Sequence, residues 1–322
     1  MNTILKTLLV TAALLPGAAQ AEEIILGHGA APTNPRHLAA KLFATQVASC
    51  TKGEITVNVA DSGTMGDDVE LLTSAASGVI QVTANSQGAV GQIVPEINAL
   101  GLPFLFSDAP TAWRVMDGEV GAMIDAKAQN AGLKVLAFWD NGIRHVSHLS
   151  KSITTPADLA GMKIRTPPDE MTTAIFTALG ANPAPLAFAE LPTALQSGVF
   201  DGQENPLTNI YSSKIHEITK FISLTGHKYE SAPLLASMAW WSSLSAESQA
   251  CVQGAATAAM WYQRGLSLDA STALVEPLKA EGVTLTEVAD RQAFIDATAA
   301  VYDDYAAKYP DLVALLREQA TK

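Results

Sequence analysis

Two arginines have the residue type and setting to bind an anion. Arg144 lies in the segment GIRHVS (142–147), and Arg165 lies in GMKIRTP (161–167). Both are expected within or at the end of a short apolar strand, where an unpaired guanidinium is costly to bury. A carboxylate is the natural bidentate partner of such a side chain. On the sequence alone, that carboxylate could belong to a ligand or to one of the chain's own acidic residues.

Residue patterns typical of enzymes are largely missing. The sequence has no G-x-S-x-G elbow, P-loop or H-E-x-x-H motif, and Gly27-His28-Gly29 does not continue into a dinucleotide fingerprint. His145 and His148 are three residues apart on an expected strand, so their side chains leave opposite faces and cannot easily share a metal. We therefore predict that the protein is not an enzyme and has no metal site and no cofactor.

Alternating strands and helices must position the two arginines. Helices are expected between most of the short strands, which we place at 23–28, 55–59, 79–83, 134–138, 142–148, 162–165, 220–224 and 233–240. A longer helical pattern covers 245–281, with possible bends at Gly265 and Pro277. This alternation predicts an α/β fold with ligand loops at strand ends. Because no Ser/Gly-rich linker divides the chain, several chain crossings between two domains are expected.

Length, charge and the first segment limit the class of protein. The chain has 322 residues, a formal net charge of −12 and two cysteines, which suits two domains and disfavours nucleic-acid binding. Residues 1–21 (MNTILKTLLVTAALLPGAAQA) have the basic start, apolar core and A-Q-A site of a signal peptide. We therefore expect export to a periplasm. There Cys50 and Cys251 could form a disulfide or remain as two buried thiols.

Three ordered blocks carry a family resemblance. They are DLAGMKIRTP (158–167), ALGANP (178–183) and Glu190 followed by ALQSGVFDGQENP (194–206). SGTMGD (62–67), LPF (102–104) and TGH (225–227) fit the same pattern. In this order and spacing the chain resembles the solute-binding proteins of tripartite ATP-independent periplasmic (TRAP) transporters, of the DctP type. The resemblance covers nearly all of the chain after the signal peptide.

The resemblance implies a two-lobed α/β periplasmic binding protein fold, with interwoven lobes and a long helix spanning both. We expect the first lobe at 22–143 plus about 232–275 and the second at 144–231 plus about 276–322. The family pattern places Arg165 on the carboxylate of an organic acid. It makes Arg144, Asn205 and Phe188 further ligand contacts. Loops of the first lobe supply additional candidates, namely Asn85, Ser86, Gln87, His28 and Asn34.

The loop that follows Arg165 bears on the identity of the ligand. Asp169 and Glu170 would accept hydrogen bonds from hydroxyls and repel a second carboxylate, unless they only cap the next helix. We therefore favour a sugar acid such as a uronate or an aldonate. A C4-dicarboxylate held by the two arginines is the alternative. A periplasmic enzyme acting on an acidic substrate and a ligand sensor for a signalling receptor stay open as other classes.

Two further segments are interpreted from their patterns. Trp240 and Trp241 are expected on a strand, where only one of them, taken as Trp240, could form a wall of the cleft. His227, Tyr229 and Glu230 form a polar cluster that we expect at the surface. The expected partners are a small organic acid and the membrane subunits of a TRAP transporter, with the receptor itself a monomer.

Overall fold

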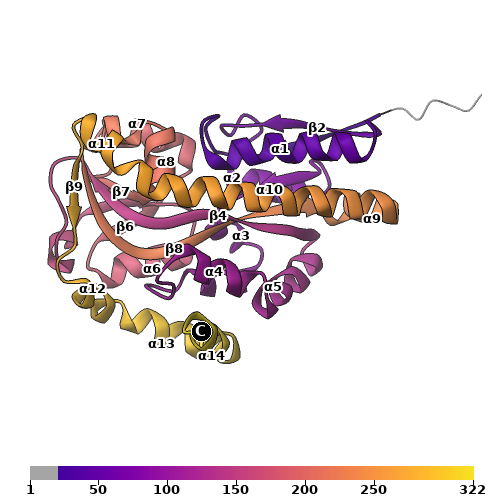
Figure 1. Cartoon of the computed structure of the whole chain (residues 1–322). Coiled ribbons are helices and arrows are strands. Elements are labelled where there is room, and N and C mark those ends of the chain that lie inside the picture. The colour runs from indigo at the N-terminus through magenta and orange to yellow at the C-terminus, as the bar shows by residue number, and fades with distance from the viewer. Residues whose placement is uncertain (1–20) are drawn as a thin grey trace, which may run out of the picture.

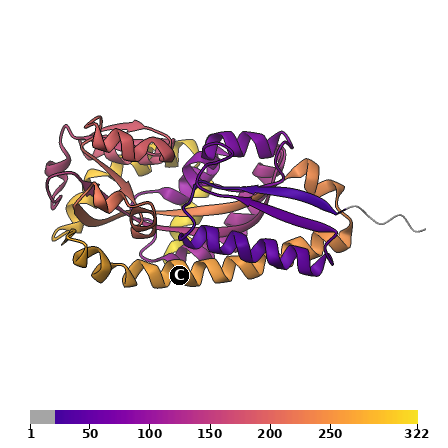
Figure 2. The same cartoon turned by 90° about the horizontal axis from the view of Figure 1, so that it is seen from above.

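The computed structural model describes residues 21–322. The predicted signal peptide at 1–21 therefore lies outside the described residues, apart from Ala21. As predicted, the described residues form an α/β fold of two lobes (Figure 1). Seen from above, the lobes lie side by side along one long helix (Figure 2).

One sheet passes through both lobes. Within residues 21–322 it has nine strands, and eight of them follow one another in the order β2 (Ile55–Ala60), β1 (Glu22–Gly27), β3 (Val82–Ala84), β8 (Phe221–Ser237), β4 (Leu133–His148), β7 (Gly202–Asn205), β5 (Lys163–Thr166) and β6 (Asn182–Pro185). The ninth, β9 (Thr284–Glu287), pairs with β8. The first lobe is thus built around β1 to β3, and the second around β5 to β7.

Two long antiparallel strands connect the lobes. β4 and β8 pair from Leu133↔Ser237 to His148↔Phe221, with irregular register near Asp140. β3 joins this ladder at one end and β7 joins it at the other. The middle of the ladder therefore lies between the lobes, where polar side chains from both strands meet.

The sequence prediction divided each of these strands in two. Asp140, Asn141 and Gly142 resemble a turn, and Gly142 has a positive φ of 121°. In the structure they form an irregular part of β4 instead, because Asp140 is held by hydrogen bonds from Trp113 and Ser267. β8 likewise continues through the polar stretch that the prediction left between two strands.

Helices cover the sheet on both sides. The first lobe has α1 (Pro35–Cys50), α2 (Asp68–Ala76), α3 (Gln87–Val90), the 3-10 helix η1 (Pro95–Gly101), α4 (Ala109–Met116), α5 (Glu119–Asn130) and α9 (Met238–Ser243). The second lobe has η2 (Pro156–Leu159), α6 (Glu170–Ala178), η3 (Phe188–Glu190), α7 (Leu191–Gln196), α8 (Leu207–Ser212) and η4 (Ile215–Glu217). The chain ends in α12 (Arg291–Ala297), α13 (Ala299–Lys308) and α14 (Pro310–Ala320).

The predicted long helix is present as α10 (Ala246–Ala273) followed by α11 (Val275–Ala280). At 1.5 Å per residue, the 28 residues of α10 extend about 42 Å. α10 packs on α1 and β4 and also reaches α8, so it spans both lobes (Figure 1). The break falls at Leu274, just before the first turn that contains Pro277, while Gly265 stays within regular helix.

A disulfide attaches α10 to the first lobe. Cys50 at the end of α1 is bonded to Cys251 in α10, with their Cα atoms 5.8 Å apart. The pairing settles the choice that the sequence left open between a disulfide and two thiols. Its cross-link closes a separation of 201 residues, which restricts the unfolded chain strongly.

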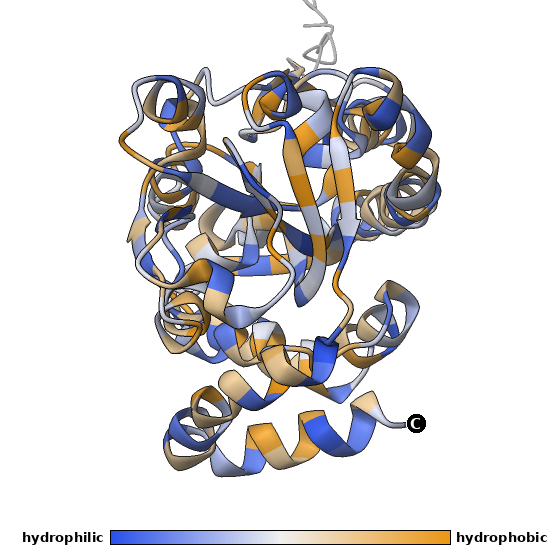
Figure 3. Ribbon diagram, turned by 90° about the vertical axis from the view of Figure 1, so that its left-hand side faces the viewer, coloured by the Kyte–Doolittle hydropathy of each residue, from blue (hydrophilic) through white to orange (hydrophobic). Residues whose placement is uncertain are grey.

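Three hydrophobic cores hold the elements together. One lies between α1, α10 and the first-lobe strands, and one lies around α7, α8 and α11 in the second lobe. The third continues beneath both lobes, because α13 packs on α6 while α14 packs on α4 and α5. Hydrophobic stretches run along the central strands, while hydrophilic stretches are prominent on the surrounding helices (Figure 3). No helix within residues 21–322 is long and apolar enough to cross a membrane.

Candidate ligand-binding site

A cavity of about 250 Å³ lies between the lobes. The first lobe contributes the loop at 29–31, the start of α1 and the start of α2 to its wall. The second lobe contributes the end of β5, the segment 187–189 and the start of α8. Five residues predicted as ligand contacts line this cavity, namely Arg144, Arg165, Phe188, Asn205 and Ser86.

Arg165 faces the cavity without a carboxylate partner. It lies on β5 between the neighbouring strands β6 and β7, and its side chain is buried. Its Nε and Nη2 donate to the carbonyl oxygen of Leu186 at 2.9 and 2.5 Å, and its guanidinium carbon is 5.7 Å from the centre of the Phe188 ring. Among the described residues, no carboxylate forms an ion pair with it.

The charge of Arg165 is therefore available to an anion. Burial lowers the pKa of the guanidinium to about 10, although Glu204 nearby opposes the shift. Arg165 is still a cation at neutral pH. A buried cation without a counter-charge is unfavourable, so a carboxylate that entered the cavity would gain both charge compensation and bidentate hydrogen bonds.

Arg144 is paired within the protein. Its Nε and Nη2 bind the Glu204 carboxylate, Nη2 also donates to the Glu204 carbonyl at 2.7 Å, and Nη1 binds Glu230. Burial alone would raise the pKa of Glu204, but Arg144 and His227 lower it to about 2. The internal salt bridge that the sequence left open is thus present, while the side chain also lines the cavity.

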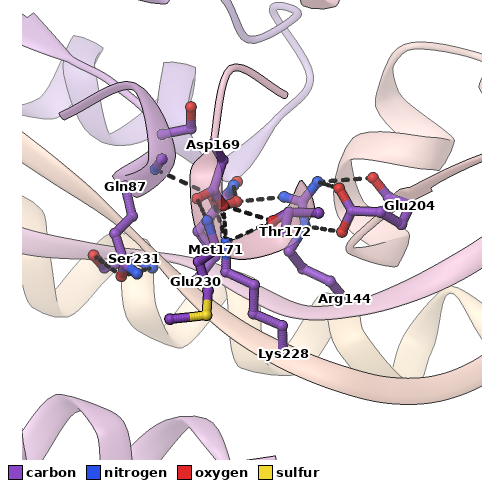
Figure 4. A network of polar contacts seen from close by, with 12 residues as sticks. Gln87, Arg144, Asp169, Met171, Thr172, Glu204, Lys228, Glu230 and Ser231 are labelled. Atoms are coloured by element: carbon purple, nitrogen blue, oxygen red, sulfur yellow. Dashed lines mark hydrogen bonds and ion pairs between the residues drawn. The ribbon is translucent and has the colours of Figure 1, made fainter. Parts of the chain in front are cut away.

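The same buried cluster continues to Asp169 (Figure 4). Asp169 does not line the cavity. Its carboxylate caps α6 through the Met171 amide at 2.9 Å, accepts from Thr172 at 2.6 Å and pairs with Lys228. Asp169 therefore acts as a helix cap, which was one of the two interpretations of this residue, and as an ion-pair partner that the sequence did not indicate.

The polar cluster expected at the surface is buried instead. His227 and Glu230 have no exposed surface and Tyr229 has only 2 %. Glu230 pairs with Arg144, and the His227 ring lies 3.2 Å from Glu204. The prediction was wrong because these partners come from β4 and β7, which local sequence cannot reveal.

Three other predicted ligand contacts, His28, Asn85 and Gln87, do not line the cavity and instead form hydrogen bonds within the protein. His28 accepts from the Ala30 amide at 3.1 Å, and burial lowers its pKa to about 3. Gln87 accepts from the Ser231 amide and hydroxyl, while Asn85 donates to the carbonyl of Asp68 at 2.5 Å.

Trp240 also lies outside the cavity wall. β8 ends at Ser237, so Trp240 belongs to helix α9 and not to the strand that the sequence prediction placed there. Its indole donates to Glu22 at 3.0 Å, and its ring packs in the core of the first lobe. The position therefore offers no support for a Trp240 wall in the cleft.

A chain of amides connects the lobes beside the cavity. Asn34 caps α1 and donates across the lobes to Asn209 at 2.9 Å and Ser212 at 3.1 Å. Asn209 in turn donates to Asn141 at 3.1 Å and Asn205 at 3.2 Å. These contacts hold the two walls of the cavity together and fix the Asn205 amide at its edge.

The sequence prediction missed three charged residues of the cavity, namely Arg36, Asp67 and Asp68. Arg36 and Asp68 have contacts that bear on a ligand. Arg36 follows the predicted cap Asn34-Pro35, so its place near a ligand loop was a usable signal. Asp68 opens α2 after the SGTMGD segment, and its Oδ2 accepts from the Ser86 amide and hydroxyl at 3.0 and 2.6 Å. Both lie on the first-lobe side, opposite Arg165.

Within residues 21–322, no group of three or more His, Cys, Asp or Glu side chains could hold a metal. The cavity instead combines a guanidinium without a counter-charge, an aromatic ring, amides and a carboxylate. Together with two lobes joined by long strands, this set defines a solute-binding protein.

The family can now be stated. The model of "Bacterial extracellular solute-binding protein, family 7" (DctP) matches residues 26–308. The chain therefore belongs to the DctP family of TRAP-type solute-binding proteins, as the sequence resemblance predicted.

Curated relatives match this chain over most of its length. An uncharacterized protein of Sinorhizobium fredii is 49% identical over 281 residues, which cover 87% of this chain and 52% of that relative, so the chain spans about half its length. The 2,3-diketo-L-gulonate-binding periplasmic protein YiaO of Escherichia coli is 35% identical over 286 residues, 89% of this chain and 87% of that one.

Solved structures share the fold. A TRAP periplasmic solute-binding protein of Roseobacter denitrificans with bound β-D-glucuronate has a TM-score of 0.89 at 34% identity, covering 92% of this chain and 99% of that one. The sugar acid binding protein of Advenella mimigardefordensis in complex with galactonate has a TM-score of 0.91 at 30% identity, with coverages of 94% and 98%. A TRAP periplasmic solute-binding protein of Sulfurospirillum deleyianum with bound succinate has a TM-score of 0.88 at 29% identity, and the match covers 92% of this chain and 99% of that one.

Proposed function

We propose that this protein is the periplasmic receptor of a TRAP transporter and that it captures a sugar acid, such as a uronate or an aldonate, by its carboxylate. The observation that carries the proposal is Arg165. It is a buried cation at a cavity between two lobes, and among the described residues only the carbonyl of Leu186 accepts its hydrogen bonds.

The surroundings of Arg165 suit a carboxylate followed by a hydroxylated chain or ring. The guanidinium offers further N–H donors that a carboxylate can take as a fork. The Phe188 ring beside it gives an apolar surface for the carbon atoms of the ligand. Amides at Asn205 and Asn209, and the carboxylate of Asp68, supply acceptors and donors for hydroxyls.

The named relatives support the sugar-acid choice. The ligands named for them include 2,3-diketo-L-gulonate, β-D-glucuronate and galactonate. A C4-dicarboxylate is the second candidate, because a further buried arginine, Arg36, lines the same cavity and one structural neighbour holds succinate.

In this proposal the receptor is a monomer that delivers its ligand to the membrane subunits of the transporter. It performs no reaction on the ligand. Family membership supports this role, since the family is one of transporter subunits. Export by the predicted signal peptide would place the receptor in the periplasm, the location in the relatives' names. We also propose that the chain crosses between the lobes near 143–144 and 231–232, which lie in the paired strands β4 and β8.

A thermal-shift screen over organic acids tests the proposal. Binding to the native state raises the melting temperature by mass action, so uronates and aldonates should raise it in the wild type and fail to do so in Arg165→Ala. Lys163→Ala is the matched control, because Lys163 lies on the same strand with an exposed side chain. A sugar acid that stabilises Arg165→Ala as well as the wild type would refute the clamp. Chemical turnover of a bound acid would refute the transport role.

A further inference from the structure

A second arginine, Arg36, is held ready at the first-lobe wall of the cavity. The cap of α1 fixes its backbone, since Asn34 Oδ1 accepts the Arg36 amide at 2.9 Å. The side chain is only 6 % exposed and lines the cavity. The fold therefore fixes the position of the Arg36 side chain at the cavity.

The guanidinium of Arg36 is only partly satisfied within the protein. Nη2 donates to Asn141 Oδ1 at 2.9 Å, and Nη1 is 3.5 Å from the carbonyl oxygen of Ala84. Among the described residues, no carboxylate is in ion-pair contact with it. A guanidinium has five N–H donors, and the described part of the protein accepts hydrogen bonds from only two of them here. Because buried donors are rarely left without an acceptor, the others are available to a group inside the cavity.

Arg36 of α1 and Asp68 of α2 both contact the chain at the end of β3, and the charge of Asp68 acts on Arg36. Arg36 reaches the carbonyl of Ala84, while Asp68 binds the next two residues, Asn85 and Ser86. The hydrogen bonds of the Asp68 carboxylate use only Oδ2, and Oδ1 has no donor within the described residues. A cation with spare donors and a carboxylate with a spare acceptor oxygen therefore adjoin in one wall.

We propose that Arg36 and Asp68 form a hydroxyl-selective subsite, which makes the receptor prefer polyhydroxylated monocarboxylates to diacids. This inference rests on the proposed function, because Arg165 must bind the one carboxylate of the ligand from the opposite lobe.

The selectivity follows from what each ligand group can do. A hydroxyl donates one hydrogen and accepts others, so it can satisfy the Asp68 oxygen and the Arg36 donors at the same time. A second carboxylate only accepts, so it gains from Arg36 but is repelled by Asp68 at short range in a partly buried site. Arg144 cannot serve a second carboxylate in place of Arg36, because Glu204 and Glu230 already compensate its charge.

Calorimetric titration with matched acids tests the subsite. Galactonate and galactarate, and likewise gluconate and glucarate, differ only in having a terminal hydroxyl or a second carboxylate. Arg36→Gln should weaken binding of the aldonates by about ten- to hundredfold and raise their preference over the diacids, because Asp68 then acts alone. Asp68→Asn should shift the preference in the opposite direction, about tenfold toward the diacids, because the repulsion is removed.

Lys41→Gln is the matched charge control, because Lys41 lies on the same helix with an exposed side chain. Opposite shifts in the aldonate-to-diacid ratio support the subsite even where a variant is less stable, since the ratio compares two ligands on one protein. Unchanged ratios, or shifts in one direction, with the wild type binding aldonates, would overturn the subsite alone. A wild type that binds none of these acids, and no uronate in the thermal-shift screen, would overturn the proposed function as well.

Discussion

Two buried arginines of the interlobe region differ in what compensates their charge. Arg144, in the middle of the long β4 and β8 ladder, binds the carboxylates of Glu204 and Glu230. Arg165, at the cavity wall, binds only a backbone carbonyl within the described chain. Burial and residue type are the same, so they cannot distinguish a structural arginine from a recognition arginine. The difference lies in the partner: Arg144 belongs to the buried ion-pair cluster between the lobes, and Arg165 is left available to bind a ligand's carboxylate.

The largest expected effect concerns stability at the ion-pair cluster of Arg144. Arg144→Ala removes the guanidinium that pairs with two buried carboxylates, Glu204 and Glu230, so it should lower the free energy of unfolding by about 3–5 kcal/mol. Arg165→Ala removes no ion pair and should change it by less than about 1 kcal/mol. Urea denaturation of both variants measures the contrast, and equal losses would remove the distinction between the two arginines.

The next effect concerns affinity at the clamp. Arg165→Ala should weaken sugar-acid binding by at least about 2 kcal/mol, because a charge-assisted bidentate contact is lost. Isothermal titration with the Lys163→Ala variant as control measures it. Wild-type affinity in Arg165→Ala would show that another cation holds the ligand's carboxylate.

Acid should weaken the ion pair between Arg144 and Glu204. The pKa of Glu204 in the folded protein, about 2, is below its ordinary value of 4.5, so its contribution is present above pH 4.5 and is lost as the pH falls toward 2. Each unit of that shift corresponds to about 1.4 kcal/mol. In Arg144→Ala this fall in stability should be much smaller, because Arg144 contributes most to lowering the pKa of Glu204 and only His227 then remains to lower it. Denaturation between pH 6 and 3 measures both proteins, and parallel curves would contradict the assignment.

The smallest effect concerns the fit between the lobes. A Cβ added at Gly88, in the first lobe, would lie 2.3 Å from the Cβ of Asp169 in the second. Gly88→Ala should therefore hinder closure and weaken ligand binding by about 1–3 kcal/mol, with a smaller change in stability. Gly254→Ala on α10 is the control, since nothing lies within 4 Å of its added Cβ. Unchanged ligand affinity in Gly88→Ala would show that the lobes adjust freely at this contact.

The sequence predicted the fold class, the long helix and the arginine at the cavity wall. Those features leave local or family-wide patterns, such as the strand with Arg165 and the helical period after Ser245. The sequence did not predict which arginine is compensated, because Glu204 and Glu230 reach Arg144 through pairing of distant strands.

The remaining differences have the same cause. Asp140 and Gly142 resemble a turn locally, and only their contacts with other elements reveal a continuous strand. Asp169 was predicted to accept hydrogen bonds from ligand hydroxyls, but its carboxylate forms an ion pair with Lys228 of β8. The spare acceptor in the cavity belongs to Asp68, from a different lobe.

A binding cycle at Arg165 tests the clamp most directly. The affinities of wild type and Arg165→Ala are measured by calorimetry for galactonate and for galactitol, which lacks the carboxylate. If Arg165 holds the carboxylate, the wild type should bind galactitol more weakly than galactonate by at least about 2 kcal/mol of binding free energy. Arg165→Ala should bind the two ligands with almost equal free energies. Equal costs in the two proteins would contradict the clamp.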